Sequence, residues 1–167
     1  MSGRAAFSDE DWSAVLQAPI LAGLAITAAE PGGLLGALSE SAAMARTLKS
    51  AAAAAAEGDL VAEVARSFEV PAEREAASAA VKALAEGLAP ADLVTASVAR
   101  LAAIMRRIEA ATPAQADAYR GFLLDLARAT AEASREGGVL GIGGVRVSEA
   151  EQRTLDDLAA ALAAPSA

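Results

Sequence analysis

Apolar side chains recur at helical spacing along most of the chain, and this pattern predicts an all-α fold. Residues 90–111 carry an apolar seam in steps of four and three residues: Val94, Val98, Leu101, Met105 and Ile108. Residues 113–136 place a second apolar group on one helical face: Tyr119, Phe122, Leu123 and Leu126. The alternation typical of a β-strand is confined to residues 145–147, a stretch too short for more than a brief pairing.

The beginning of the first helix is marked by two local signals. Ser8, with Asp11 three residues later, forms a variant of the capping box. Phe7 and Trp12 occupy the two positions of a hydrophobic staple, which fixes the direction in which the chain enters the helix. We therefore expect a helix to start immediately after Ser8.

Pro19 is expected to interrupt this first helix. Proline has no backbone N–H, so the helix should kink or end there and a second helix should cover 19–30, before the turn at Pro31. The same start and stop signals predict further helices over 35–57, 59–69, 71–87, 90–111, 113–136 and 149–164. The chain should thus contain seven or eight helices.

Caps are predicted for three of the later helices. Asp59 is placed to cap the short helix that follows Gly58. Thr112 with Gln115, and Ser148 with Glu151, have the spacing of capping boxes. Each of these pairs should satisfy backbone N–H groups at the start of its own helix.

The predicted architecture is a compact bundle with a glycine-rich apolar loop before the last helix. At 167 residues the chain fits one all-helical domain covering 1–167, with flexible ends at 1–7 and 165–167. Helices 90–111 and 113–136 should form an antiparallel hairpin, because one residue joins them. Aromatic residues make up 3%, so the core should be built from Leu, Ile and Val, with Ala as spacer.

Charge and hydropathy limit the partners. The formal charge is -8 and the pI is near 4.6, which opposes binding to nucleic acid or to an anionic membrane. Residues 12–29 form the one uncharged stretch of membrane-spanning length, but Pro19 and Gly23 interrupt it and acids flank it. We expect a buried core helix there, no membrane partner, and a cytoplasmic location.

Two residue types that support much enzyme chemistry are absent from the sequence. Without Cys there are no disulfides, thiolate nucleophiles or zinc–sulfur sites. Without His there is no Ser-His-Asp triad, HExxH zinc site or Glu-x-x-His di-iron site. We therefore predict no catalytic residues, no metal site and no cofactor.

The most unusual segment is the apolar glycine-rich loop before the last helix. It consists of Gly137, Gly138, Val139, Leu140, Gly141, Ile142, Gly143, Gly144, Val145 and Arg146. Its backbone N–H groups, with Arg146, could form an anion site at a helix N-terminus. The loop lacks a P-loop or Rossmann pattern, however, and Glu149 and Glu151 oppose an anion. Packing against the protein or against a partner is the favoured interpretation.

Charged residues elsewhere are interpreted as solvated or ion-paired faces. Asp125 stands out among the carboxylates because it follows two leucines on an apolar helix, although Arg120 and Arg128 are close enough to pair with it. Arg100 and Arg107 lie two turns apart and are expected to form salt bridges within or between subunits. No carboxylate group has the spacing of a calcium loop.

Two glycine-containing turns resemble each other, at 30–36 and 136–141. Each is followed by an Arg-Thr-Leu sequence, at 46–48 and 153–155. An internal duplication would produce this similarity. Bias in a chain rich in Ala and Gly also produces it and is the favoured explanation.

The function predicted from these features is a small non-enzymatic protein-interaction module or the subunit of a homo-oligomer. The glycine-rich loop and the Ala-rich helix faces are its expected contact surfaces. A first alternative is a helical binding protein for a small apolar ligand. A second is an enzyme that uses carboxylates, Arg and an anion site at the glycine-rich loop.

Overall fold

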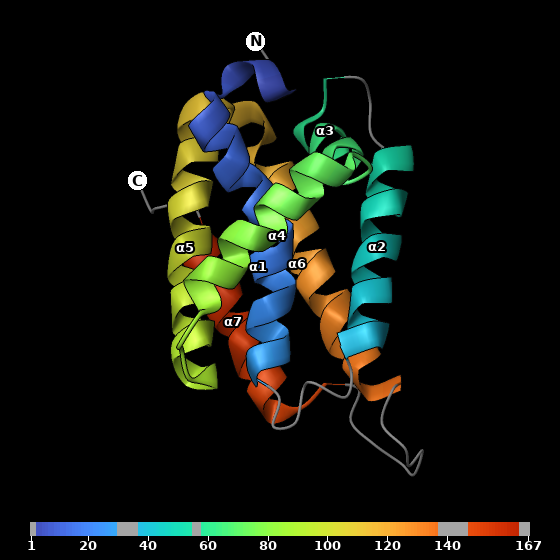
Figure 1. Ribbon diagram of the computed structural model, residues 1–167, viewed down its shortest axis with the longest axis vertical. Coiled ribbons are helices and arrows are strands. Elements are labelled where there is room, and N and C mark those ends of the chain that lie inside the picture. Colours follow the sequence, from blue (N-terminus) through green and yellow to red (C-terminus); the bar gives the residue numbers. More distant parts are fainter. Residues whose placement is uncertain (1–2, 30–36, 55–57, 137–146, 164–167) are drawn as a thin grey trace.

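The computed structural model describes residues 3–29, 37–54, 58–136 and 147–163 (Figure 1). These residues form one 3₁₀ helix and seven α-helices without a β-strand, which confirms the all-α prediction. The elements are η1 (Gly3–Ala6), α1 (Asp9–Ala29), α2 (Ala37–Ala54), α3 (Leu60–Ser67), α4 (Pro71–Ala85), α5 (Pro90–Ala111), α6 (Pro113–Glu136) and α7 (Glu149–Leu162).

Helix α1 runs through the middle of the bundle and contacts each of the other six α-helices. Figure 1 shows α5 on one side of α1 and α6 on the other, with α4 crossing in front of it. Helix α2 packs along α6, and the short α3 lies near one end of this pair. Twelve of the 21 residues of α1 are buried, so α1 forms the centre of the core.

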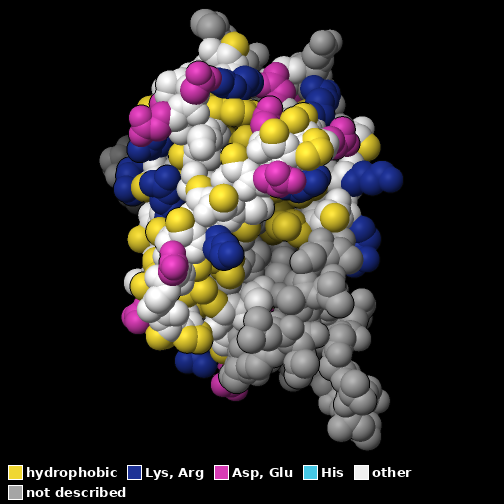
Figure 2. All heavy atoms as spheres, in the orientation of Figure 1, with side chains coloured by type: hydrophobic (Ala, Val, Ile, Leu, Met, Phe, Trp, Pro, Cys, Tyr) yellow, Lys and Arg dark blue, Asp and Glu magenta, His cyan; other side chains and the backbone are white. Residues whose placement is uncertain are grey.

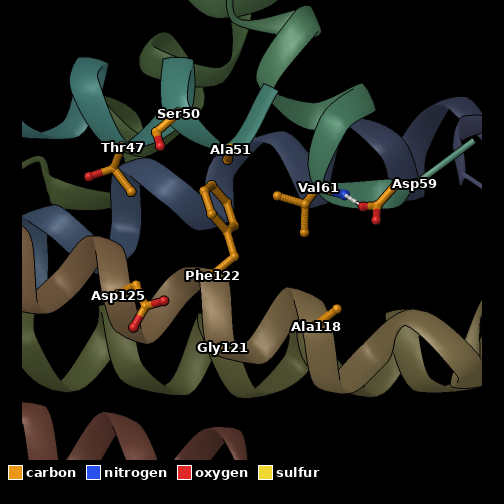
Figure 3. Close-up of a pocket in the computed structure, with 9 residues that line it drawn as sticks. All are labelled: Thr47, Ser50, Ala51, Asp59, Val61, Ala118, Gly121, Phe122 and Asp125. Atoms are coloured by element: carbon orange, nitrogen blue, oxygen red, sulfur yellow. Dashed lines mark hydrogen bonds between the residues drawn. The ribbon is translucent and has the colours of Figure 1, made fainter. Parts of the chain in front are cut away.

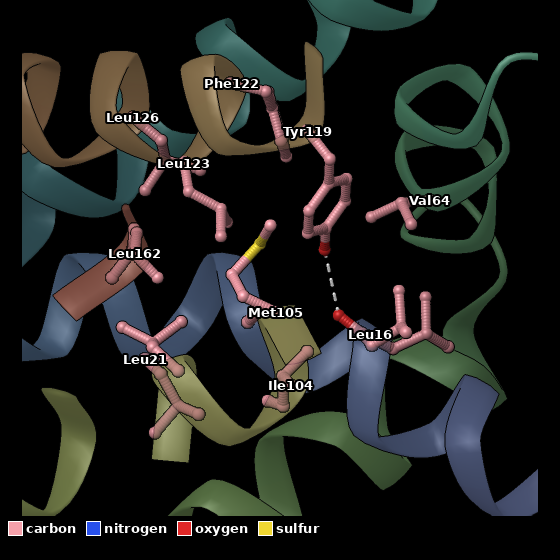
Figure 4. Packing of buried hydrophobic residues seen from close by; sticks show 14 of the residues in the cluster. Leu16, Leu21, Val64, Ile104, Met105, Tyr119, Phe122, Leu123, Leu126 and Leu162 are labelled. Carbon is pink, nitrogen blue, oxygen red and sulfur yellow. Dashed lines mark hydrogen bonds between the residues drawn. The ribbon is translucent and has the colours of Figure 1, made fainter. Parts of the chain in front are cut away.

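One hydrophobic cluster joins side chains from all seven α-helices. Figure 4 shows part of it. Aliphatic residues such as Leu21, Ile104 and Leu126 fill most of it, with fully buried alanines between them. The aromatic rings of Tyr119 and Phe122 also belong to it, and their centroids lie 5.8 Å apart. The apolar face predicted for residues 113–136 is therefore the face that α6 buries.

Pro19 does not divide the first helix, and the prediction of two helices over residues 9–30 is wrong. In an uninterrupted α-helix the N–H of residue 19 would donate to the carbonyl oxygen of Val15. Here the Tyr119 hydroxyl of α6 donates to that oxygen, at 3.0 Å, as the dashed line in Figure 4 shows. Tyr119 and Val15 are both fully buried. A side chain from another helix thus replaces the missing backbone donor, and α1 continues through the proline.

The N-terminal cap and staple of α1 form as predicted. The hydroxyl of Ser8 accepts a hydrogen bond from the backbone N–H of Asp11, at 3.1 Å. The rings of Phe7 and Trp12 are both buried, with centroids 6.0 Å apart. Residues 1–7 were expected to be flexible, yet residues 3–6 form η1, and its Arg4 backbone N–H donates to the Glu63 carboxylate of α3.

The predicted capping box of Thr112 and Gln115 is wrong. The Thr112 hydroxyl donates back to the carbonyl of Ile108, at 3.2 Å. The Gln115 side chain accepts from the backbone N–H of Leu60, at 2.7 Å, and donates to the carbonyl of Gly58, at 3.1 Å. Gln115 therefore caps α3 rather than its own helix, because the first N–H groups of α3 also need acceptors. These bonds join α3 to α6.

Helices α5 and α6 have the predicted bounds, and Thr112 joins them. They contact each other, but Figure 1 shows them diverging away from this junction, with α1 packed against both. Arg120 of α6 strengthens the junction, since its guanidinium binds Glu109 of α5 at 2.7 Å and also bonds the Leu162 carbonyl at the end of α7. The hairpin prediction is therefore correct for the connection and only partly correct for the packing.

The predicted caps of α3 and α7 are confirmed. The Asp59 carboxylate accepts from the backbone N–H of Val61, at 2.8 Å. Ser148 and Glu151 form both bonds of the capping box, at 3.1 and 2.8 Å. Both pairs are local in sequence, and this explains why their spacing was sufficient to find them.

Helix α1 is long and apolar enough to cross a membrane when judged by length and composition alone. In the folded chain, 67% of its most apolar window is buried by the other helices. The core helix of a soluble protein passes the same test, so the composition of α1 is weak evidence for a membrane span.

Candidate functional site

The ten residues predicted to form an interaction loop, 137–146, lie outside the described residues. So do most of the two similar glycine-containing turns. The packing, interface and anion-binding hypotheses for this loop therefore stay predictions. Within the described residues, two other surfaces have a composition and shape suited to binding: the outer side of α4, and a cleft between α2, α3 and α6.

Helix α4 lies on the outside of the bundle. Its inner side buries Ala77 and Val81, which pack toward α1. Among the described elements, α1 is the helix that α4 contacts most extensively. The rest of the surface of α4 is accessible, and in Figure 2, which views the molecule in the orientation of Figure 1, small apolar side chains there alternate with isolated charges.

An apolar strip runs along the accessible surface of α4, and we call it the α4 face. Four of its alanines are all exposed and follow steps of four, three and four residues: Ala72, Ala76, Ala79 and Ala83. Val70 and Leu88, just beyond the two ends of the helix, are 44% and 39% exposed, and they are the large hydrophobic residues found exposed within the described chain. Steps of four and three residues keep side chains in one row along a helix.

Two opposite charges accompany the α4 face. Glu75 and Lys82 are both exposed and lie seven residues apart, so they point in nearly the same direction from the helix. Neither forms an ion pair with another described residue. Side chains of this kind remain available to a partner.

The cleft lies where α2 and α6 separate and α3 fills the gap (Figure 3). It is open to the surface and has a volume of about 510 Å³. Its walls come from three elements, and its lining residues are Thr47, Ser50, Ala51, Asp59, Val61, Ala118, Gly121, Phe122 and Asp125. The two bonds of Gln115 to residues 58 and 60 hold the α3 wall in place.

The centre of the cleft is apolar and its ends are acidic. Figure 3 shows the ring of Phe122 between the carboxylates of Asp125 and Asp59. Asp125 pairs with Arg128 at 3.1 Å, as the sequence suggested, but both side chains are exposed, at 72% and 58%. Such a pair is weak in water. Asp59 uses one oxygen to cap α3.

The perturbed ionisable groups lie outside both surfaces. Hydrogen bonds from Ser8 and Arg107 hold the pKa of Asp11 below its usual value. Burial raises the pKa of the Tyr119 hydroxyl, which keeps it protonated as a donor. Both groups therefore serve packing and capping. Among the described residues, no three acidic side chains gather as metal ligands.

The other predicted charged residues occupy structural positions. Arg107 pairs with Asp11 at 2.5 Å, within the chain, and joins α5 to the start of α1. Arg100 donates to the side-chain oxygen of Gln17, at 3.3 Å. Arg120, expected near Asp125, binds other partners instead, so Arg128 alone of the two candidate arginines pairs with Asp125 in the described chain.

Sequence reasoning did not find either surface as a unit. The alanine steps of the α4 face are visible in the sequence, but Ala is common throughout this chain and only burial separates the exposed row from the others. Phe122 was assigned to the core, and it is indeed 7% exposed, yet its ring also lines the cleft. The cleft joins residues from three helices, and no local spacing signals that.

Comparison with known proteins adds no likeness from which a function could be transferred. No protein-family model matches the chain, and neither a curated protein sequence nor a solved structure matches it.

Proposed function

We propose that this protein is a non-enzymatic helical interaction module that forms a homodimer through the α4 face. The observation that carries the proposal is the placement of two exposed hydrophobic residues at equal distances from Ala79. Val70 and Leu88, the two exposed large hydrophobic residues at its ends, each lie nine positions from Ala79. Two copies of α4 packed antiparallel about this point place Val70 of each subunit beside Leu88 of the other.

The alanine row suits this arrangement. A methyl group at each contact position lets two helix backbones approach closely, and the steps of four and three residues match the seam of paired helices. A single helix from each subunit is a small interface, and weak interfaces lie at the small end of the observed range. We therefore expect association that depends on protein concentration.

The charges support the same orientation. In the antiparallel pair, Glu75 lies within one residue of the position opposite the partner's Lys82, close enough for these long side chains to pair. The symmetry repeats this contact, giving two ion pairs for each dimer. A parallel pair would instead align like charges. The pattern thus favours a second copy of this chain over an unrelated partner.

Sedimentation equilibrium over a series of protein concentrations tests the proposal. Lys82→Glu converts both intersubunit attractions into repulsions and should raise the dimer dissociation constant by at least about fourfold, from energies of roughly 0.2–1 kcal/mol for each pair. Combining it with Glu75→Lys exchanges the charges and should restore dimerisation. Lys82→Glu combined with Asp157→Lys on α7 has the same net charge as this double variant, and as the matched control it should not restore dimerisation.

A second pair of variants tests the close contact. Ala79→Gln keeps a good helix former but adds bulk at the symmetry point, so it should abolish the dimer. Ala160→Gln makes the same change at an exposed alanine of α7 and should have no effect. A wild-type protein that stays monomeric at millimolar concentration, or a charge exchange that fails to restore the dimer, would contradict the proposal.

A cytoplasmic location belongs to the same proposal. It is supported by the burial of α1, the most apolar helix, beneath the other helices. Separation of soluble and membrane fractions tests it, and recovery in the membrane fraction would contradict it.

A further inference from the structure

The cleft between α2, α3 and α6 has the chemistry of a site for an elongated organic cation. Its two carboxylates, Asp59 and Asp125, lie at opposite ends with the Phe122 ring between them (Figure 3). A ligand that satisfies all three groups needs a positive charge near each end and an apolar middle. We propose that the cleft binds a linear aliphatic di- or polyamine.

The length of the cleft sets the spacing of the charges. Figure 3 shows Asp59 across the cleft from Ala118, at the same end of the cleft, and Ala118 and Asp125 are seven residues apart on α6. Seven residues of an α-helix span about 10 Å. An extended amine with ammonium groups separated by a chain of methylene groups has this length, whereas a compact metal ion cannot reach both ends.

The floor of the cleft is kept open at Gly121. A Cβ atom added at Gly121 would meet no other atom within 4 Å, so close packing does not demand glycine there. Glycine in the middle of a helix is nevertheless unfavourable relative to alanine. A ligand chain lying along α6 between Phe122 and Ala118 explains why this position lacks a side chain, because it would use the space above the glycine.

Both carboxylates have an oxygen that can accept a hydrogen bond from an ammonium group. One oxygen of Asp59 caps α3, and Figure 3 shows the other directed toward α6. Asp125 is held by Arg128 in an exposed ion pair that an incoming cation displaces at small cost. The Phe122 ring offers an apolar surface to the methylene chain, and hydroxyl groups of Thr47 and Ser50 line the α2 wall.

The charge of the whole protein favours the same class of ligand. A formal charge of -8 raises the local concentration of cations near the surface and speeds their association. This attraction is not selective by itself. Selectivity for a long dication comes from the two separated carboxylates, because a monoamine can neutralise only one of them at a time.

Titration calorimetry at low ionic strength, with spermidine as the probe, tests the proposal. We expect saturable binding with one site per chain. Asp59→Asn, which retains a capping side chain, and Asp125→Asn should each weaken binding by about tenfold, the value of one charge-assisted hydrogen bond. Butylamine, with one charge, should bind far more weakly than spermidine.

Two further variants separate a binding site from general charge attraction. Gly121→Val fills the floor and should abolish binding, while circular dichroism shows the helices intact. Arg128→Gln removes the competing cation and should tighten spermidine binding. Arg106→Gln, a matched control that removes the same charge from an exposed position on α5, should leave the affinity unchanged.

Equal binding of spermidine and butylamine, or unchanged affinity in the two Asp variants and in Gly121→Val, would overturn the proposal. Absence of saturable binding to the folded wild-type protein would do the same. The inference does not depend on the α4 dimer. The Lys82→Glu variant, if monomeric, should still bind spermidine, so the failure of one proposal is distinguishable from the failure of the other.

Discussion

Replacing Tyr119 with Phe should destabilise the protein by removing one oxygen atom. The hydroxyl of Tyr119 donates to the carbonyl of Val15, which loses its helical donor because residue 19 is proline. Both groups are fully buried, so water cannot replace the bond. An unsatisfied buried polar group costs about 1–3 kcal/mol. For a chain of this size, that lowers the melting temperature by roughly 2–4 °C for each kcal/mol.

The specific reasoning concerns the proline, and a double-mutant cycle tests it. Pro19→Ala returns an N–H that can donate to the Val15 carbonyl. In that background Tyr119→Phe should cost less, and the difference between the two backgrounds should be about 1–2 kcal/mol. Urea unfolding followed by circular dichroism gives the four free energies of unfolding. Equal costs of Tyr119→Phe in both backgrounds would refute the idea that the tyrosine compensates for the proline.

Alkaline pH gives an independent measurement of the same group. Burial raises the pKa of Tyr119 above the value of about 10 that it has in the unfolded chain. The unfolded state therefore releases this proton first, and the stability that is present below pH 10 should fall as the pH rises above it. Tyr119 is the one tyrosine in the sequence, so its absorbance reports ionisation directly. Ionisation that precedes unfolding would contradict the buried hydrogen bond.

Three further predictions concern single contacts. Gln115→Ala should lower the free energy of unfolding by about 1–3 kcal/mol, because it leaves the first N–H of α3 without its acceptor. Urea unfolding measures this loss, and unchanged stability would argue against the Gln115 cap. Ser97→Ala should leave the free energy of unfolding unchanged or raise it by up to about 1 kcal/mol, since the buried Ser97 hydroxyl has no hydrogen-bond partner among the described residues. A large loss of stability, measured in the same way, would contradict this. Arg107→Gln should raise the pKa of Asp11, measured by carbon NMR. The lowered pKa of Asp11 contributes stability above its ordinary value of 3.8 that is lost as the pH falls through the folded-state value, so this acid-dependent loss should be smaller in the variant.

The helices were predictable from the sequence because their signals are local. The caps at Ser8, Asp59 and Ser148 each involve residues within three positions of one another, and all three form. The bounds of α5 and α6 also follow from adjacent prolines and apolar spacing. Each signal describes an interaction that exists in the helix itself, whatever the rest of the chain does.

The errors arose where a distant part of the chain supplied a partner. Gln115 reaches α3, 55 residues earlier in the sequence, so its spacing to Thr112 was misleading. Pro19 would end a solitary helix, but Tyr119 supplies a donor from 104 residues away. The α4 face and the cleft were missed for the same reason, because exposure and the separation of three helices are properties of the assembled bundle.

The central position of α1 has a consequence for the synthesis of the protein. This helix is synthesised before the other six α-helices, and α5, with which it packs most extensively, is complete only at Ala111, 82 residues after Ala29. At about 5–20 residues per second, that delay is roughly 4–16 seconds. During this interval the most apolar segment of the nascent chain lacks its main cover. We therefore expect arrest of translation before α5 to yield an aggregation-prone chain, in which α1 is the segment that chaperones bind.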